Sequence, residues 1–455
     1  MNSFSLKYPG PVPLLAVLWA STVVADDIQE GIEAFNSKDY MTALEVWMPL
    51  AEGGDLSAMY NIGLLYDEGL GVDTNKARAL EWYLPPAEDG DVAAQFNMAT
   101  IYDFGEGVPE DNEEALYWYT AAAMQSDEQA QFNLGVMYAN GEGVEIDHRD
   151  SLKWYLLSAD QGHAPAQYNL AHMYDTGAAI TEDNHEAMKW YLKAAEQGNA
   201  DAQYAIALMH DTGDGFIEDD VLAIKWYELA AEQGVLNAQF NLAIMYDVGE
   251  GVPEDNVRAI KWYEAAGNQG HQNAQLNLGL MYKNGEGTEV DTELAMQWYR
   301  KAADQGLTDA QYAVALMFDE GVGVEEDNVA AIGWYTRAAE QGDINAQNNL
   351  GAMYDAGEGI SEDDAEAVKW YLMAADQGNP IAQNNLGAMY FAGEGIAEDK
   401  IEAYKWFFIS GELGNDDGQD NSELVGKSMD LADIMQARKR GREWLEKFKY
   451  GSSNL

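Results

Sequence analysis

Residues 238–270, AQFNLAIMYDVGEGVPEDNVRAIKWYEAAGNQG, contain the pattern that decides the fold of this chain. Small and apolar side chains between Ala238 and Tyr246 recur at the spacing of one helix face, which predicts a first helix. Gly249 is expected to end it, because glycine tolerates the left-handed conformation that closes a helix C-terminus. A second helix is predicted from about Asn256 to Gly270. The stretch therefore indicates a helical hairpin.

The same hairpin recurs every 36 residues along most of the chain. The recurrent alanine runs from Ala58 to Ala382 and the turn glycine from Gly69 to Gly393, both at this step. Tryptophan keeps the step at Trp82, Trp118, Trp154, Trp190, Trp226, Trp262, Trp298, Trp334, Trp370 and Trp406. A fixed period of roughly 20–50 residues is typical of stacked supersecondary units. We place ten repeats at residues 55–414.

Composition excludes several classes of protein. The 455 residues carry a formal net charge of −54, from 79 acidic and 25 basic side chains, and contain no cysteine. Such a chain repels phosphate backbones, which argues against nucleic-acid binding. Without cysteine it has no disulfide framework and no Cys-ligated zinc or iron–sulfur site. A hydrophobic share of 47% is enough for a packed core, so the composition does not indicate disorder.

The first 25 residues have the pattern of a targeting segment. An apolar run from Leu14 to Val24 is followed by Ala25 and by the acidic residues Asp26 and Asp27. A short apolar run that ends in small residues predicts a secretory signal peptide over residues 1–25. The run is too short for a transmembrane helix, which needs about 20 apolar residues. A buried N-terminal helix is the alternative. The mature chain is thus predicted to be periplasmic or secreted, without membrane insertion.

The repeat unit also has a recognisable consensus, Ala-Gln-x-Asn-Leu-Gly-x-Met-Tyr in its first helix and Trp-Tyr-x-x-Ala-Ala-x-x-Gly in its second. It resembles the Sel-one-like repeat (SLR), a relative of the tetratricopeptide repeat, in the secreted bacterial type. The resemblance implies an all-α, right-handed α-solenoid of about ten hairpins. It also implies an N-terminal capping hairpin over 26–54 and a C-terminal capping helix and tail over 415–455, since a solenoid needs shielded ends.

A few positions depart from the consensus. Ser126 and Ala179 replace turn glycines, and His210 stands where most repeats have tyrosine. Proline at position 49 and at Pro85–Pro86 falls late in predicted helices, where it is expected to kink or end them. We interpret these departures as local changes in geometry.

The sequence offers no catalytic constellation. The six histidines lie in different phases of the repeat, and no nucleophile–base order, metal-ligand pair or phosphate-binding loop stands out. We therefore predict no enzyme activity, no cofactor and no metal site. His210–Asp211 is interpreted as a ring substitution in the core. The acidic turns at 103–111 and 355–364 are interpreted as solvated turns, with weak divalent-cation binding as the alternative.

An asparagine recurs three residues after the recurrent alanine, on the first helix. The predicted partner-binding residues are Asn97, Asn133, Asn169, Asn241, Asn277, Asn349 and Asn385; Asn61 has the same position, and Ala205 and Ala313 replace it in two repeats. In tetratricopeptide-type stacks the first helices line the concave surface, where an amide can donate to and accept from a peptide backbone. The alternative is that each amide bonds the neighbouring repeat.

These observations favour an exported, non-catalytic scaffold or adaptor that binds a protein partner through the concave face of the solenoid. The adaptor role itself is implied by the resemblance to SLR proteins. The alternatives are an envelope hydrolase or glycan-processing enzyme and, more weakly, an acidic surface protein that binds divalent cations.

Overall fold

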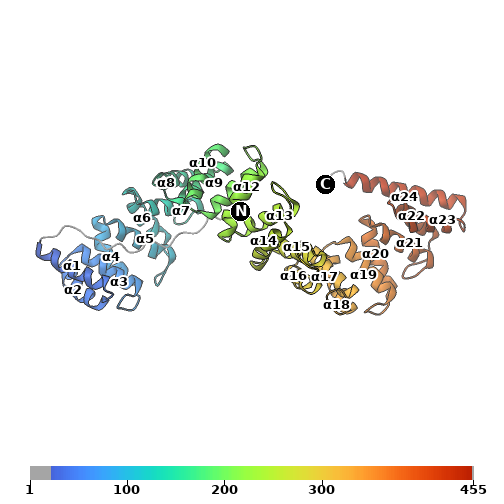
Figure 1. Ribbon diagram of the computed structural model, residues 1–455, viewed down its shortest axis with the longest axis horizontal. Helices are drawn as coiled ribbons and strands as arrows, with labels where there is room; N and C mark the ends of the chain where they lie inside the picture. The colour runs from blue at the N-terminus through green and yellow to red at the C-terminus, as the bar shows by residue number, and fades with distance from the viewer. Residues whose placement is uncertain (1–21, 453–455) are drawn as a thin grey trace. The chain divides into compact units, whose positions relative to one another are not determined.

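The computed structural model describes residues 22–452 and the side chains of residues 27–449. This part of the chain forms 24 α-helices and no strand (Figure 1). The predicted all-α fold of tandem hairpins is thus confirmed. The predicted signal peptide lies outside the described residues, apart from residues 22–25 at the start of the first helix.

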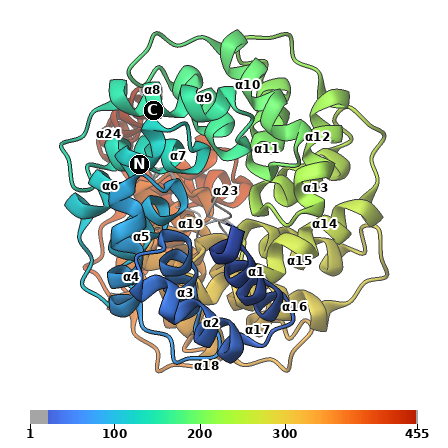
Figure 2. The same ribbon diagram turned by 90° about the vertical axis from the view of Figure 1, so that its left-hand side faces the viewer.

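The chain divides into two compact units, which meet between Gln233 and Gly234. The helices of the first unit are α1 (Thr22–Asn36), α2 (Tyr40–Glu52), α3 (Leu56–Glu68), α4 (Lys76–Asp89), α5 (Val92–Phe104), α6 (Asn112–Met124), α7 (Glu128–Asn140), α8 (His148–Asp160), α9 (Ala164–Thr176), α10 (Asn184–Glu196), α11 (Ala200–Thr212) and α12 (Asp220–Glu232). Figure 2 shows its hairpins following one another in chain order.

The second unit repeats the arrangement. Its helices are α13 (Leu236–Val248), α14 (Asn256–Asn268), α15 (Gln272–Asn284), α16 (Thr292–Asp304), α17 (Thr308–Glu320), α18 (Asn328–Glu340), α19 (Ile344–Ala356), α20 (Asp364–Asp376), α21 (Pro380–Ala392), α22 (Lys400–Glu412), α23 (Asp416–Gly426) and α24 (Leu431–Ser452). Within each unit the second helix of a hairpin packs against its own first helix and against the first helix of the next hairpin.

Local chemistry sets the ends of each helix. The predicted hairpin at 238–270 is α13 and α14, and α13 ends at Gly249 with φ +74°. The Asp255 carboxylate caps α14 by accepting the backbone N–H of Arg258 at 3.1 Å. Ser126 and Ala179 adopt φ +70° and +66° where other repeats have glycine, so both side chains occupy a backbone region that disfavours them.

The prolines do not end their helices, and in this respect the sequence-based expectation was wrong. Helix α2 continues past Pro49 to Glu52, and α4 continues past Pro85 and Pro86 to Asp89. Each proline removes one hydrogen bond, the one that its missing N–H would donate to the carbonyl four residues earlier, and leaves the other bonds of the helix in place. Because Pro86 is buried, packing also holds the final turn of α4 in place.

Tyrosine, more than tryptophan, fills the centre of each hairpin. Tyr263 is 1% exposed and the neighbouring Trp262 8%, whereas Trp226 is only half-buried. The tyrosine ring lies directly on the first helix: a Cβ added at Gly279 would come within 2.4 Å of the Tyr299 ring. The two helices therefore approach closely only where the facing residue is glycine or alanine.

Within each unit, a buried glutamine joins most hairpins to the one before. Gln275 at the start of α15 donates from Nε2 to the Gly267 carbonyl of the preceding second helix, at 2.8 Å. Its Oε1 accepts from Gln305 Nε2 at the end of its own hairpin, also at 2.8 Å. We call this pair of bonds the glutamine relay. It recurs at Gln95, Gln131, Gln167, Gln203, Gln311 and Gln347.

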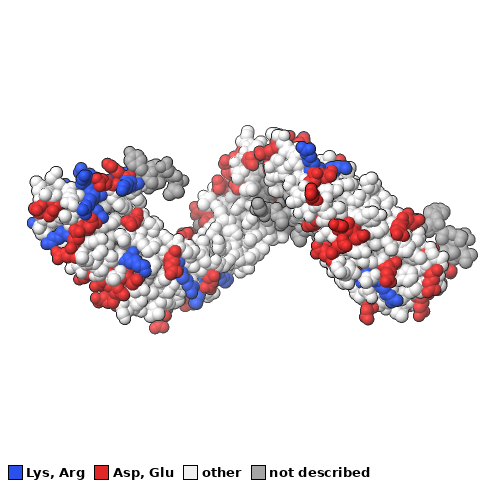
Figure 3. Space-filling view, turned by 180° about the vertical axis from the view of Figure 1, so that it is seen from behind, with Lys and Arg blue, Asp and Glu red and all other residues white. Residues whose placement is uncertain are grey.

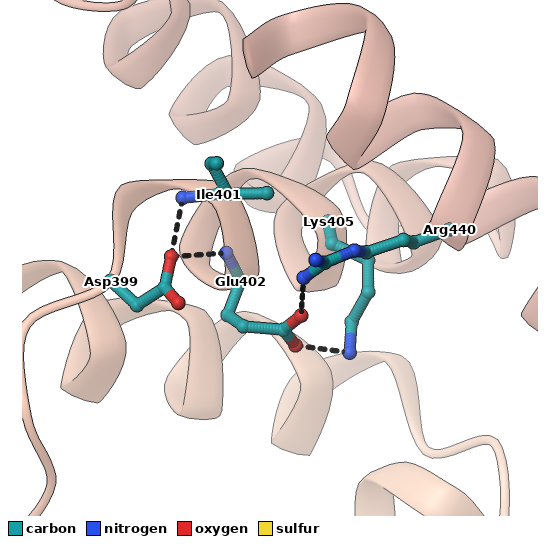
Figure 4. Close-up of polar contacts among 5 residues, drawn as sticks. All are labelled: Asp399, Ile401, Glu402, Lys405 and Arg440. Atoms are coloured by element: carbon teal, nitrogen blue, oxygen red, sulfur yellow. Dashed lines mark hydrogen bonds and ion pairs between the residues drawn. The ribbon is translucent and has the colours of Figure 1, made fainter.

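A carboxylate of the final repeat contacts the last helix. Figure 4 shows Glu402 of α22 accepting from Arg440 of α24 at 2.7 Å while it also pairs with Lys405. Asp399 caps α22 by accepting the N–H groups of Ile401 and Glu402 at 2.9 and 3.1 Å. Since α24 also packs along α22, the final hairpin has a neighbour on its outer side.

Breaking the glutamine relay should destabilise the stack. Gln275→Ala removes the side-chain donor to the buried Gly267 carbonyl, which keeps the Gly270 N–H at 3.1 Å, and removes the acceptor of Gln305. We expect a loss of about 1–3 kcal/mol in the free energy of unfolding. Urea denaturation followed by circular dichroism measures it. The matched control is Gln272→Ala, an exposed residue of the same helix, which should change stability by no more than about 0.5 kcal/mol. Equal losses for the two variants would refute a structural role for the relay.

Candidate functional site

The asparagine ladder lies where consecutive hairpins meet. Asn133 and Asn169 are 0% and 2% exposed. The other predicted partner-binding residues, Asn97, Asn241, Asn277, Asn349 and Asn385, are half-buried on their first helices. The ladder is therefore uneven: its N-terminal part is mostly covered by neighbouring side chains, and its later members keep some contact with solvent.

Within each unit, ladder amides lie beside the central tyrosine of the preceding hairpin. Asn349 Nδ2 is 3.1 Å from Tyr335 Oη, to which it donates. Asn277 takes the same place beside Tyr263: burial raises the pKa of that phenol, the Asp247 carboxylate raises it further, and the Asn277 amide lowers it. These contacts favour the alternative in which the ladder joins neighbouring repeats.

That the asparagine ladder binds a partner stays a prediction. The structure reduces the number of ladder asparagines that are accessible to a partner. Asn133 and Asn169 offer almost no accessible surface, at 0% and 2% exposed, because neighbouring side chains cover them. The half-buried amides can contact a tyrosine and still leave part of their surface to a ligand. The two interpretations are thus compatible at the later positions of the ladder.

A second set of amides was not singled out from the sequence. Asn385 Nδ2 is 3.4 Å from Asn348 Oδ1, and Asn421 Nδ2 is 2.9 Å from Asn384 Oδ1. These contacts link the first helices of consecutive hairpins directly. The signal was present in the doubled asparagines that begin at positions 348 and 384.

The sequence analysis also missed a tyrosine–aspartate pair inside most hairpins. Tyr263 donates to the Asp247 carboxylate at 3.1 Å, and burial raises the pKa of that carboxyl while the tyrosine lowers it. The spacing of 16 residues was readable from the repeat. The pair recurs with Asp67, Asp103, Asp175, Asp211, Asp319 and Asp355 as acceptors.

This pair explains the His210–Asp211 dipeptide. Asp211 accepts from Tyr227 at 2.8 Å, as its equivalents do in other repeats. The His210 ring lies 6.2 Å from the Phe216 ring, in the place that tyrosine occupies elsewhere. The geometry agrees with a ring substitution and gives the two residues no shared site.

Among the described residues, no group of three His, Asp or Glu side chains is arranged to hold a metal ion. Glu106, in one of the acidic turns, pairs instead with Lys76 at 3.0 Å. None of the described helices is both long enough and apolar enough to cross a bilayer.

Comparison with known proteins identifies the family. The Sel1 repeat model matches ten consecutive segments, beginning one residue later than our placement: residues 56–91, 92–127, 128–163, 164–199, 200–235, 236–271, 272–307, 308–343, 344–379 and 380–415. The chain belongs to the Sel1 repeat family. Sel1 repeat proteins generally mediate protein–protein interactions and generally act as non-enzymatic scaffolds.

Two solved structures are similar over most of their length. One is a protective antigen present in uropathogenic Escherichia coli strains, which displays an SLR fold; it is 33% identical, with a TM-score of 0.65, over 89% of this chain and 95% of that chain. The other is a Sel1 repeat protein from Oxalobacter formigenes, 33% identical with a TM-score of 0.52, over 68% of this chain and 90% of that chain. A search of curated proteins found no significant match.

The tyrosine–aspartate pair predicts unequal effects of one substitution. Tyr263→Phe removes the donor to Asp247 and should cost about 1–3 kcal/mol of unfolding free energy. Tyr155→Phe is the matched control, because Ala139 stands where the aspartate would be, and its loss should be clearly smaller. Chemical denaturation at pH 7 measures both. A control as damaging as Tyr263→Phe would show that the carboxylate is not the partner that matters.

Proposed function

We propose that this protein is an exported, non-catalytic adaptor that binds a protein partner through the face formed by its first helices. The proposal is carried by the surface of that face. Leu280, on α15, keeps 47% of its surface exposed one helical turn from the half-buried Asn277. Apolar surface beside amide groups is suited to packing on and hydrogen bonding with a polypeptide.

The charge of the chain favours a cationic partner. Acidic side chains are spread over the visible surfaces of both units, with fewer basic ones among them (Figure 3). With a formal net charge of −54, the surface attracts basic proteins and accelerates their association at low salt. It repels other anionic macromolecules by the same forces.

Site-specific cross-linking tests where the partner binds. A photoreactive residue at Leu280 should cross-link to the partner in cells that produce the protein. The control is Leu229, a 45% exposed leucine on the second helix α12, which should give no such product. The adducts are resolved by gel electrophoresis and mass spectrometry. A partner captured equally at both positions, or only at Leu229, would place binding on another face and contradict the proposal.

Export has its own test. If residues 1–25 are a signal peptide, the protein recovered outside the cytoplasm should begin at Asp26 when its N-terminus is sequenced. Replacing Leu14 and Leu15 by Asp should keep the precursor in the cytoplasm, because the apolar run is interrupted. Full-length protein in the cytoplasm without either change would contradict export.

A further inference from the structure

An open cavity of about 780 Å³ lies between the first helices α9 and α11 of the first unit. It opens at the place where Ala205 replaces the ladder asparagine. Four aromatic rings line it, those of Tyr168, His172, Tyr191 and Tyr204, and the His172 ring stacks on that of Tyr168 with the centroids 6.4 Å apart. The departure from the consensus thus coincides with a hollow on the face to which we assign partner binding.

Carboxylates give this cavity a strong negative character. Asp175, Asp201 and Asp214 all line it, with no lysine or arginine among the lining residues. Burial raises the pKa of Asp175, and Asp214 raises it further while Tyr191 and His172 lower it. Burial, Asp201 and Asp175 together raise the pKa of Tyr168 to about 12. The lining groups therefore favour a positive charge in the cavity.

The cations nearest in sequence are engaged elsewhere. Between residues 161 and 222 the chain has two basic side chains, Lys189 and Lys193. Lys189 pairs with Glu186 on its own helix α10 at 2.5 Å. Lys193 Nζ lies 3.5 Å from the centroid of the Trp190 ring. Among the lining residues His172 is the one side chain able to carry a positive charge, so a permanent counter-charge has to come from another molecule.

We propose that this cavity binds an arginine side chain of the protein partner. The inference rests on the proposed function, since the arginine belongs to that partner. A guanidinium is planar: it stacks on tyrosine rings and donates two parallel hydrogen bonds to a carboxylate. Tyr168 and Tyr204 offer half-buried rings, and Asp201 and Asp214 offer exposed carboxylates at the rim. Asn184 holds the Asp214 carboxylate in place at 2.9 Å.

The chain supplies its own control. Three repeats later, Ala313 also replaces the ladder asparagine. Asp309 and Tyr312 stand there at the positions of Asp201 and Tyr204. At this second gap, however, Lys283 takes the place of Asp175 and Val322 that of Asp214, so the site lacks two carboxylates and gains a cation. An arginine is not expected to bind there.

Calorimetric titration of the purified chain with the peptide acetyl-Gly-Arg-Gly-amide at low salt tests the proposal. We expect saturable binding, which Asp201→Asn and Asp214→Asn each weaken by about tenfold, since each removes a charge-assisted hydrogen bond. Ala205→Asn restores the consensus residue, which folds in the other repeats, and should abolish binding by filling the gap. Asp309→Asn and Ala313→Asn should leave the affinity unchanged.

Other ligands and outcomes are distinguished in the same experiment. The same peptide with lysine in place of arginine should bind more weakly, and the peptide with the uncharged citrulline in that place should not bind. Equal binding of the citrulline peptide, tighter binding of spermidine, or full binding by the Ala205→Asn variant would overturn the proposal. If the partner cross-links at Leu280 but the arginine peptide does not bind, the proposed arginine site is wrong and the adaptor function is unaffected. The predicted peptide binding without any partner cross-linked at Leu280 would contradict the adaptor function alone.

Discussion

A glutamine amide buried between two hairpins has to be matched on both its oxygen and its nitrogen, and this requirement fixes how each hairpin sits on the previous one. Gln275 meets it with the Gly267 carbonyl on one side and Gln305 on the other. A hairpin rotated or shifted along its neighbour would leave the amide unpaired in the interior, at a cost of about 1–3 kcal/mol for each lost partner. Apolar packing alone does not set the register so strictly, since it is much less directional.

The other regular features follow from that register. In hairpins such as that of Tyr371, the central tyrosine lies on a glycine of the first helix, and its hydroxyl reaches the aspartate near the end of that helix. The ladder asparagine of the next hairpin then approaches the same hydroxyl, as Asn349 does at Tyr335. Many of the recurring polar side chains thus form hydrogen bonds within the protein. Binding specificity has to come from positions that differ between repeats, and the gap at Ala205 is such a position.

The sequence predicted the hairpins closely because their signals are local. Gly249 ends α13 as expected, and α14 begins at Asn256. The late prolines were misjudged as helix ends, since the packing that holds the last turn, as at the buried Pro86, is not visible in a local pattern. The glutamine relay and the tyrosine–aspartate pair were present as constant spacings. Their meaning, however, depends on which carbonyl or carboxylate faces the side chain, and only the packed structure shows this.

The candidate site was less predictable than the fold. An amide at the edge of a hairpin has the same sequence signature whether it contacts a neighbouring repeat or a partner, so Asn277 left both interpretations open. Ala205 was visible as a departure, yet the cavity beside it arises from residues of two repeats. Asp175 and Asp201 come together only because successive first helices lie side by side.

Excision of a single repeat tests the central claim most directly, that each hairpin is held in register by contacts with its immediate neighbours. Deleting residues 272–307 brings Gln311 opposite the Gly267 carbonyl that Gln275 now contacts, so the relay can reform. The shortened chain should unfold cooperatively on heating, with unchanged helicity per residue by circular dichroism and a midpoint a few degrees lower. A shortened chain that loses its helicity or melts without cooperativity would contradict the account.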